Sequence, residues 1–590
     1  MRPDGRSLIA LGVVLGLISG LTEGVGHMVL QRLNVLDNSW YPIIWSAAVF
    51  YGLALGGVGL LAATVASRHP GSTRLLTTGV FSLFFLSIVP VMALMLKEWI
   101  YTYAILLLAV GTATALTRWQ LRQEQWRFVS ARSVRWAVGL TLLAFAIIEG
   151  SGRIQERVAI SRLPVPRTST PDVLLIIVDT LRSDHLSSYG YSRRTSPAID
   201  ALASGGVLFE NSFATSSYTL PSHVSILTGQ FPRDHGVEWG TSHRWPAQAG
   251  QTLPQVLQTL GYRTGAFSAN TFYFTREHGF GRGFLHFEDF FYSLSDMAWR
   301  TAYGAIATRL VRQRLGWEDL PARKRAADVS ESAARWIDRD TDRPFFVTLN
   351  YMDAHDPYLP PEPYRSRFAT KPNPGGLINS KWHIPRTLPP DQLQSEQDAY
   401  DGAIAYIDDQ ISRLLSTIKS MSRPRDLLVI VTADHGEEFG EHGGFLHQRH
   451  LYREVLQVPL IVWAPGRVPG GKRVSAPVSN AAIPATVAGL LDAGREPFPS
   501  PSLQPLWEGT RTAFPAPLSE LKHMPWAWPS DAPIKFGSMR SLVDESWHYI
   551  ERDGRAPELF AWPTDRSERS NLADAPELQG VIERFRKLMK

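Results

Sequence analysis

Long apolar stretches dominate the first 150 residues of this 590-residue chain, whereas polar and apolar segments alternate along the rest. Five apolar runs stand out, at residues 7–24, 42–66, 75–96, 100–117 and 133–148. Each is close to the roughly 20 residues that a helix needs to cross a bilayer. More apolar runs follow the first, which has no obvious small-residue cleavage site, so it predicts an anchor and not a removed signal peptide. Residues 1–150 are therefore predicted to form a transmembrane domain of about five helices.

The placement of positive charge predicts the orientation of these helices. With the N-terminus in the cytoplasm, the loops on the opposite side hold only Arg32 and Lys97. The cytoplasmic segments hold Arg2, Arg6, Arg68, Arg74, Arg118, Arg122, Arg127 and Arg132. An odd number of crossings then places everything after about residue 150 outside the cytoplasm. We expect a multi-pass protein of the cell membrane whose C-terminal part is periplasmic or on the cell surface.

Residues 151–170 (SGRIQERVAISRLPVPRTST) are polar and contain prolines, which predicts a linker. From residue 171 to 590, strand-like runs alternate with helical patterns. This alternation predicts an α/β domain with a central, mostly parallel sheet, helices on both faces and a small C-terminal subdomain. A helix–turn–strand unit is expected at residues 253–270, and an amphipathic helix at residues 399–418.

Composition narrows the chemistry only slightly. The chain contains no cysteine, which excludes disulfides, thiolate catalysis and zinc sites built from Cys. The net charge of +5 is modest, and no nucleic-acid partner is expected.

Three continuous apolar runs end abruptly in acidic residues or histidine. DVLLIIVDT ends at Asp179, PFFVTLNYMDAHDPY carries Asp353 and His355, and DLLVIVTADHGEEF carries Asp434 and His435. Such runs are typical of strands buried on both faces, and ligands of open α/β sheets bind beyond the carboxyl ends of the strands. The five side chains are therefore predicted to share one edge of the sheet, where they suit a hard or borderline divalent cation. For each residue alone, a turn or a buried hydrogen-bonded pair is the alternative.

The stretch SSYTLPSHVSILTGQF, residues 216–231, places Thr219 at the predicted start of a helix. An ordinary capped helix start is one interpretation, since Ser and Thr satisfy free backbone N–H groups there and Pro221 suits the first turn. The other interpretation is a nucleophile. Metal coordination can activate a hydroxyl, and the positive end of a helix stabilises a developing anion.

Together these strings resemble the sulfatase-like branch of the alkaline phosphatase superfamily, from about residue 171 to residue 571. The opening DVLLIIVDTLRSDHLSSYGY, the segment VTADHGEEFGEHGGF with LYREVLQVPLIVWAPG, and the ending PELFAWPTDRSERSNLA resemble family motifs. TLPSHVSILTG is similar to the family's active-site pattern Cys/Ser-x-Pro-Ser-Arg-x-x-Leu-x-Thr-Gly.

The departures from that pattern bear on the chemistry. The nucleophile position is Thr219, whose secondary alcohol cannot be oxidised to the aldehyde formylglycine, and the arginine position is His223. The family's paired acids after the first strand are reduced to Asp179 followed by Thr180. Where many sulfatases have Gly-Lys-Trp-His-Leu-Gly, this chain has GAFSAN. Sulfate-specific features are therefore missing, and no formylglycine is expected.

The combination looks like lipoteichoic acid synthases and phosphoethanolamine transferases, membrane-embedded relatives with a Thr nucleophile. The resemblance implies one divalent ion (Mn, Mg, Ca or Zn) on Asp179, Thr219, Asp434 and His435, and leaves room for a second. It further implies catalysis by Thr219 and His355, with His355 protonating the leaving group. The same resemblance makes His447, His223 and His442 candidate substrate contacts.

The function expected from this resemblance is a membrane-anchored phosphodiesterase or phosphotransferase that acts on cell-envelope lipid or glycan through a phosphothreonine ester. Three alternatives stay open: a sulfatase that works without formylglycine, a catalytically degenerate binding scaffold, and a transporter formed by residues 1–150. Glu23 and Glu149 are the charged residues that favour a transporter. The substrate, the acceptor, the oligomeric state and a second metal using Asp353 or a further histidine are left undetermined.

Overall fold

The chain folds into two compact units, here described separately. The computed structural model describes residues 5–32, 42–96, 100–122, 131–167, 170–238, 245, 250–290, 294–304, 323–379, 384–421, 423, 425–494, 497–527 and 531–589. One unit comprises Met1–Val158 with Phe291–Trp317, and the other comprises Ala159–Phe290 with Glu318–Lys590.

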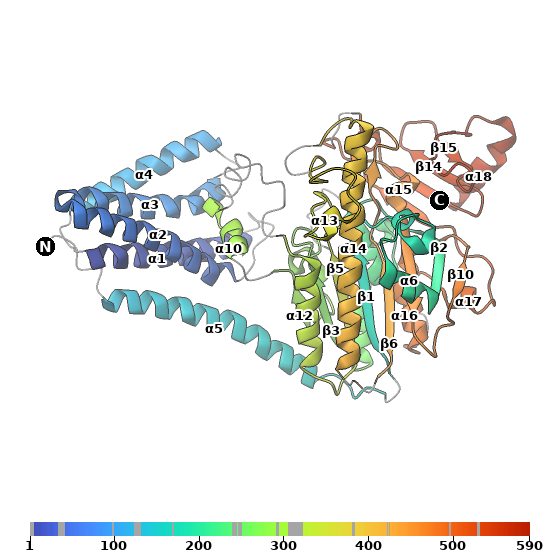
Figure 1. Ribbon diagram of the computed structural model, residues 1–590, viewed down its shortest axis with the longest axis horizontal. Helices are drawn as coiled ribbons and strands as arrows, with labels where there is room; N and C mark the ends of the chain where they lie inside the picture. Colours follow the sequence, from blue (N-terminus) through green and yellow to red (C-terminus); the bar gives the residue numbers. More distant parts are fainter. Residues whose placement is uncertain are drawn as a thin grey trace. The chain divides into compact units, whose positions relative to one another are not determined.

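Helices form at all five predicted apolar runs. They are α1 (Gly5–Arg32), α2 (Ile43–Arg68), α3 (Thr73–Leu96), α4 (Thr102–Arg122) and α5 (Ala131–Ser161) (Figure 1). Among the described residues, four of these helices are long and apolar enough to be candidate membrane spans. The apolar stretch found in α3, Thr73–Ile88, is shorter.

Helices α1 and α2 pack backbone against backbone. Gly12, Gly16, Gly20 and Gly24 recur every fourth residue on one side of α1. A Cβ atom added at Gly20 would overlap the backbone of Ala47 and Ala48 in α2. Small residues at this spacing let membrane helices approach closely and gain van der Waals contact.

The predicted domain limits differ from the structure in two places. Helix α5 continues to Ser161, so the first part of the predicted linker is helical; Ile154 and Val158 extend its periodicity, and the first proline follows only at residue 164. In addition, α10 (Leu294–Arg300), from within the predicted soluble domain, packs against α2.

Two carboxylates of the N-terminal unit, those of Glu23 and Glu149, have hydrogen-bond partners within it. The Glu23 carboxylate, buried in α1, accepts hydrogen bonds from the Tyr51 hydroxyl at 2.6 Å and from the Ala302 N–H at 2.9 Å. Glu149 accepts a hydrogen bond from the Trp45 indole N–H at 3.3 Å. These bonds give both carboxylates a structural part in packing the unit.

The second unit is built on a nine-stranded sheet with the order β10-β2-β9-β6-β1-β5-β3-β4 and with β11 paired to β2. The strands are β1 (Asp172–Val178), β2 (Val207–Phe213), β3 (Arg263–Ser268), β4 (His286–Glu288), β5 (Phe345–Tyr351), β6 (Leu427–Thr432), β9 (Gln457–Trp463), β10 (Lys472–Val474) and β11 (Val478–Ser479). Neighbours pair in parallel except at β9, which is antiparallel to β6 and β2. The sheet is therefore mixed, with the predicted parallel arrangement at its centre.

The three strands predicted to end in acidic residues or histidine lie side by side at this centre. β1 pairs with β6 on one side and with β5 on the other. Val178 is in register with Tyr351, and Ile177 with Thr432, so all three strands end at the same level. The segments that follow them consequently meet at one edge of the sheet.

Both faces of the sheet are buried, as the continuous apolar runs predict. Successive residues of β1 point to opposite faces: Leu175 belongs to one hydrophobic cluster and Leu174 to the other. The first cluster includes residues of α7 (Thr219–Thr228), α9 (Leu253–Thr259) and α16 (Ile483–Leu490). The second includes residues of α6 (Pro197–Ser204), α12 (Ala326–Asp338) and α14 (Pro390–Ser420) (Figure 1).

Shortening Leu175 to alanine is expected to destabilise this unit strongly. The side chain is fully buried in the central strand, so Leu175→Ala should lower the free energy of unfolding by about 2–5 kcal/mol. Denaturant unfolding of the full-length protein in detergent measures this change. Leu377→Ala is the matched control, because that side chain is 41% exposed and its loss should cost no more than about 0.5 kcal/mol.

A small C-terminal subdomain is present as predicted. It contains a four-stranded antiparallel sheet of β12 (Leu518–Leu521), β13 (Met539–Val543), β14 (His548–Arg552) and β15 (Glu558–Phe560). Helix α18 (Gln579–Leu588) covers this sheet through Ile582 and Phe585, which share a hydrophobic cluster with Tyr549.

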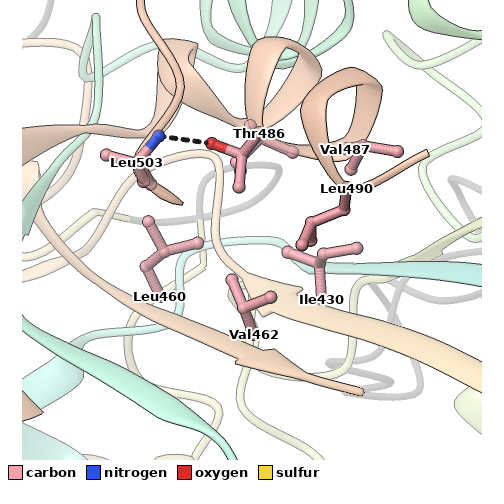
Figure 2. Close-up of a pocket in the computed structure, with 8 residues that line it drawn as sticks. Ile430, Leu460, Val462, Thr486, Val487, Leu490 and Leu503 are labelled. Carbon is pink, nitrogen blue, oxygen red and sulfur yellow. Dashed lines mark hydrogen bonds between the residues drawn. The ribbon is translucent and has the colours of Figure 1, made fainter. Parts of the chain in front are cut away.

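A pocket between the sheet and α16 is part of the core. Figure 2 shows aliphatic side chains of β6, β9 and α16 around it. Its polar side chain, Thr486, donates a hydrogen bond to the Ala482 carbonyl and accepts one from the Leu503 N–H at 2.9 Å. Because this hydroxyl is already satisfied, the pocket offers no polar group for orienting a ligand.

Candidate active site

The ends of β1 and β6 bring two acids and a histidine together. Asp179 directly follows β1, while Asp434 and His435 follow β6 after one intervening residue. One potential ligand atom from each of the three lies within 4.8 Å of the others, and all three residues are fully buried. The prediction that strand ends assemble these residues is confirmed.

Thr219 lies against this cluster. It is the first residue of α7, and its Oγ1 is 3.2 Å from Nε2 of His435. Tyr218 occupies the N-cap position and no side-chain hydrogen bond caps the helix, so Thr219 has no capping role. The alternative of an ordinary capped helix start is therefore wrong for this hydroxyl.

The protonation pattern of His435 follows from its contacts. Its Nδ1–H donates to the Gly436 carbonyl at 3.0 Å, which leaves the Nε2 lone pair facing Thr219 and the acids. Burial lowers the pKa of His435 to about 4, so the ring is neutral at physiological pH. A neutral imidazole with a free Nε2 lone pair is suited to bind a metal.

The donor set fits a divalent cation. Oδ1 of Asp179 and Oδ2 of Asp434 are buried and accept no hydrogen bond from the described residues. Burial, reinforced by the charge of Asp434, raises the pKa of Asp179 to about 6. Burial also raises the pKa of Asp434 to about 7. Burial thus disfavours the charged forms of these two facing carboxylates, and a bound cation would stabilise those charged forms.

The other carboxylate oxygens are held in place. Oδ2 of Asp179 accepts a hydrogen bond from the Asn270 amide at 2.7 Å, and Oδ1 of Asp434 accepts from the backbone N–H groups of His435 and Thr180. Thr180 adopts a φ of 60°, which is rare for a β-branched residue. Its hydroxyl bonds to the carbonyls of Asp179 and Ala354 hold it there. Backbone strain of this kind is concentrated at functional sites.

Removing the Asn270 amide is expected to weaken metal binding without emptying the site. Asn270→Ala leaves the ligand Asp179 without its orienting partner, and such losses typically cost 10–100-fold in affinity. Isothermal titration of Mn²⁺ into metal-stripped full-length protein measures the change. Asn211→Ala is the control, since this amide bonds to the Ser475 carbonyl away from the cluster; an equal loss in both variants would contradict the role of Asn270.

His223 lies in the interior behind Thr219. Its Nδ1–H donates to the Thr219 carbonyl at 3.0 Å, and its Nε2 is 3.3 Å from the Asn350 amide. The ring is fully buried, packs against Phe274 and has a pKa lowered by burial to about 3. A neutral ring in this place orients the backbone of Thr219 and does not supply the positive charge of an arginine.

His355 and His447 lie together beside His435. The His447 ring centroid is 4.3 Å from that of His435 and 5.1 Å from that of His355. Burial acts to lower the pKa of His355, but the charge of Asp356 and a hydrogen bond to it raise that pKa to about 10. Burial lowers the pKa of His447 well below its usual value. The His355 ring is therefore positively charged, whereas the His447 ring is neutral.

Two predicted residues lie outside this cluster. Asp353 accepts hydrogen bonds from the Ala326 N–H at 2.8 Å and from Arg325 at 3.3 Å, so its carboxylate is already paired. The His442 ring stacks on Tyr452 at a centroid distance of 3.7 Å and approaches Glu454. In the described residues His442 is therefore part of a different group of side chains.

Sequence reasoning missed Asn270 and Glu437 as parts of the site. Glu437 is fully buried and accepts a hydrogen bond from Nδ1–H of His447 at 2.9 Å. Glu437 stands two residues after His435, and Asn270 stands two residues after β3. Because Asn270 lies just beyond a strand end, its place in the site could have been predicted from the sequence. The contact of Glu437 with His447 could not, because it depends on how the segment between these two residues folds.

Comparisons with known proteins agree with this architecture. A family model described as Sulfatase matches residues 171–493. The chain is similar to iduronate 2-sulfatase of Mus musculus, with 27% identity over 346 residues, covering 51% of this chain and only 60% of that protein. It is also similar to an arylsulfatase of Clostridium perfringens, with 25% identity over 362 residues, covering 51% of this chain and 70% of that protein.

Solved structures show the same fold. The phosphonate monoester hydrolase of Agrobacterium radiobacter superposes with a TM-score of 0.56 at 22% identity, covering 71% of this chain and 95% of that one. The structural likeness concerns the fold, and the chemistry of this chain depends on its own residues.

Proposed function

Because this chain belongs to the sulfatase family, as a sulfatase-like hydrolase of the alkaline phosphatase superfamily, we propose that it cleaves or transfers phosphoryl esters with Thr219 as nucleophile. One observation carries the proposal: the Thr219 hydroxyl lies 3.2 Å from Nε2 of His435, within the group that suits a cation. A threonine cannot become formylglycine, so its own oxygen is the available nucleophile.

Asp179, Asp434 and His435 would hold the divalent ion, together with the Thr219 oxygen. When bound, such an ion neutralises charged ester oxygens and lowers the pKa of the hydroxyl. Its identity, among Mn, Mg, Ca and Zn, is left to measurement. The donors are carboxylates and an imidazole, which admit both hard and borderline ions.

The chain's own residues then divide the reaction into two steps. The Thr219 oxygen, having lost its proton to solvent, bonds to phosphorus while the bond to the leaving oxygen breaks. His355, charged by its pairing with Asp356, donates a proton to that oxygen. The free N–H groups at the start of α7 stabilise the anionic phosphoryl oxygens. Water or an alcohol acceptor subsequently takes the phosphoryl group from Thr219.

The exposed apolar side chains of the N-terminal unit support the proposal that the substrate belongs to the cell envelope and is held at a membrane. Leu53, Leu61, Leu107 and Leu142 are all more than half exposed on helices that are candidate spans. An apolar surface of this kind is suited to lipid contact. We extend the proposal to a multi-pass anchor with the sulfatase unit on the extracytoplasmic side, where membrane lipids or cell-envelope glycans are the substrates.

A sulfate ester is the second candidate, favoured by the sulfatase names of the similar proteins. The neutral His223 and the GAFSAN segment favour phosphate over it, because positive sulfate contacts of the family are absent at both places. A degenerate scaffold is a third reading, which predicts neither turnover nor a stoichiometric metal.

The deciding experiment compares three substrates on the purified full-length protein: an aryl phosphodiester, an aryl phosphonate monoester and an aryl sulfate. Each is assayed after metal stripping and after addition of Mn²⁺, Mg²⁺, Ca²⁺ or Zn²⁺. Metal-dependent turnover of a phosphorus ester supports the proposal. Turnover of the sulfate alone would replace it with the second candidate, and no turnover together with no bound metal would favour a scaffold.

A further inference from the structure

A second group of metal-ligating side chains lies outside the active-site cluster. Ligand atoms of Glu438, His450 and Glu454 lie within 4.8 Å of one another. Nε2 of His450 is 2.9 Å from Oε2 of Glu438 and 3.8 Å from Oε1 of Glu454. His442 extends the group, with its Nε2 3.5 Å from Oε1 of Glu454.

Two atoms directed into this group have no hydrogen-bond partner among the described residues. They are Oε1 of Glu454 and Nε2 of His442, and the Glu454 residue is only 8% exposed. A buried carboxylate oxygen without a donor is costly. Oε1 of Glu438, by contrast, already has partners, because it accepts hydrogen bonds from the N–H groups of His442 and Gly444 at 2.9 Å.

We infer that Glu438, His450, Glu454 and His442 form a second metal site, for a first-row divalent transition ion such as Zn²⁺. Mixed imidazole and carboxylate donors favour such an ion over Ca²⁺ or Mg²⁺, which prefer all-oxygen sites. Its burial makes it a structural site, since catalytic metals keep a position open to solvent and substrate.

The position of this second site in the chain indicates a structural role for the bound ion. Glu438 belongs to β7 (Glu438–Phe439), which pairs with β8 (Phe445–Leu446), and Glu454 belongs to α15 (Arg453–Leu456). His447, which lies against His435, stands between these ligands in the sequence. An ion joining the two ends of this segment would fix the loop that presents His447 to the active site.

A proton on His450 is the competing occupant. Burial acts against the charged ring, but the neighbouring Glu438 carboxylate raises the pKa of His450 overall. The Tyr452 N–H donates to Nδ1 of His450 at 3.3 Å, and Arg449 adds positive charge close to Glu438. Because Nδ1 accepts this N–H, the ring carries its proton on Nε2 and donates it to Oε2 of Glu438. A ring protonated on Nε2 binds no metal through that atom, so counting ions separates the two states.

The test counts zinc per chain by mass spectrometry on the full-length protein in detergent, after equilibration with Zn²⁺ and removal of free ion. We expect two ions in the wild type and one in Asp179→Asn/Asp434→Asn, which disables the active-site cluster. We also expect one in His450→Gln/Glu454→Gln. The control His548→Gln, which alters the histidine of another buried His–Glu pair, should keep two.

Two results would overturn the inference: no ion left in Asp179→Asn/Asp434→Asn, or two ions retained in His450→Gln/Glu454→Gln. If the His450/Glu454 variant does not fold, the decision comes from Co²⁺ added to Asp179→Asn/Asp434→Asn. Visible absorption of a protein-bound Co²⁺ ion, lost on competition with Zn²⁺, supports the site, and its absence contradicts it. None of these readouts depends on Thr219, so failure here leaves the proposed reaction separately testable.

Discussion

Thr219→Ala is expected to lower metal-dependent turnover of an aryl phosphodiester by at least about 10³-fold while leaving the fold intact. The substitution removes the oxygen that lies 3.2 Å from Nε2 of His435. Water attacking directly would have to replace a nucleophile held at the start of α7, and the entropic advantage of that placement would be lost. Steady-state kinetics on the full-length protein measure the change.

Thr228→Ala is the matched control for this variant. Thr228 lies in the same helix, is 1% exposed and donates its hydroxyl hydrogen bond to the Val224 carbonyl, away from the acids. Its loss should change stability but not turnover. Thr219→Ser keeps a hydroxyl at the same place and is expected to retain activity within about 10-fold. Equal activity in Thr219→Ala and the wild type would show that Thr219 is not the nucleophile.

Asp434→Asn is expected to abolish the active-site metal and to reduce turnover by at least about 100-fold. The amide oxygen can still accept the N–H groups of Thr180 and His435 that Oδ1 accepts now. The amide nitrogen would then replace Oδ2, the atom that faces the site without a partner. A neutral NH₂ group cannot bind a cation, so the variant should lose affinity without losing its local hydrogen bonds.

Metal titration measures the loss of affinity in Asp434→Asn, and thermal unfolding in the presence of a chelator measures the stability of the metal-free variant. Because the variant also removes one of two facing buried charges, its stability with chelator should be no lower than that of the wild type. Asp408→Asn is the control: Asp408 is another buried carboxylate, which accepts N–H groups of Ala198 and Ile199. Loss of metal binding in Asp408→Asn as well would mean that the effect is not specific to the site.

The N-terminal helices and the core of the candidate site could be predicted from local sequence patterns. Apolar runs of bilayer length predicted five helices, and a helix is present at each of them. Uninterrupted apolar strands followed by Asp179 and by Asp434 with His435 predicted a shared sheet edge, because parallel strands present their carboxyl ends together. Such signals are local in sequence, and the physical rule that connects them to the fold is simple.

Other residues could not be assigned in that way, because their roles depend on contacts between distant segments. His223 matches the position of a charged family residue, yet burial against Phe274 makes it neutral. His442 lies seven residues after His435 in the sequence, but it stacks on Tyr452 and approaches Glu454 instead. Asn270 becomes part of the site only because β3 lies beside β5, one strand from β1.

By itself, the sequence predicted the helices of the N-terminal unit, the α/β class of the rest, and one sheet edge shared by Asp179, Asp434 and His435. These follow from hydrophobic periodicity and from the chemistry of side chains at strand ends, whereas the resemblance to the sulfatase-like family added Thr219 to them. Only the tertiary structure decided that residues 294–304 pack with the N-terminal helices. It also decided which histidines are charged, neutral or grouped with Glu438 and Glu454, because burial and neighbouring charges act through space and not along the chain.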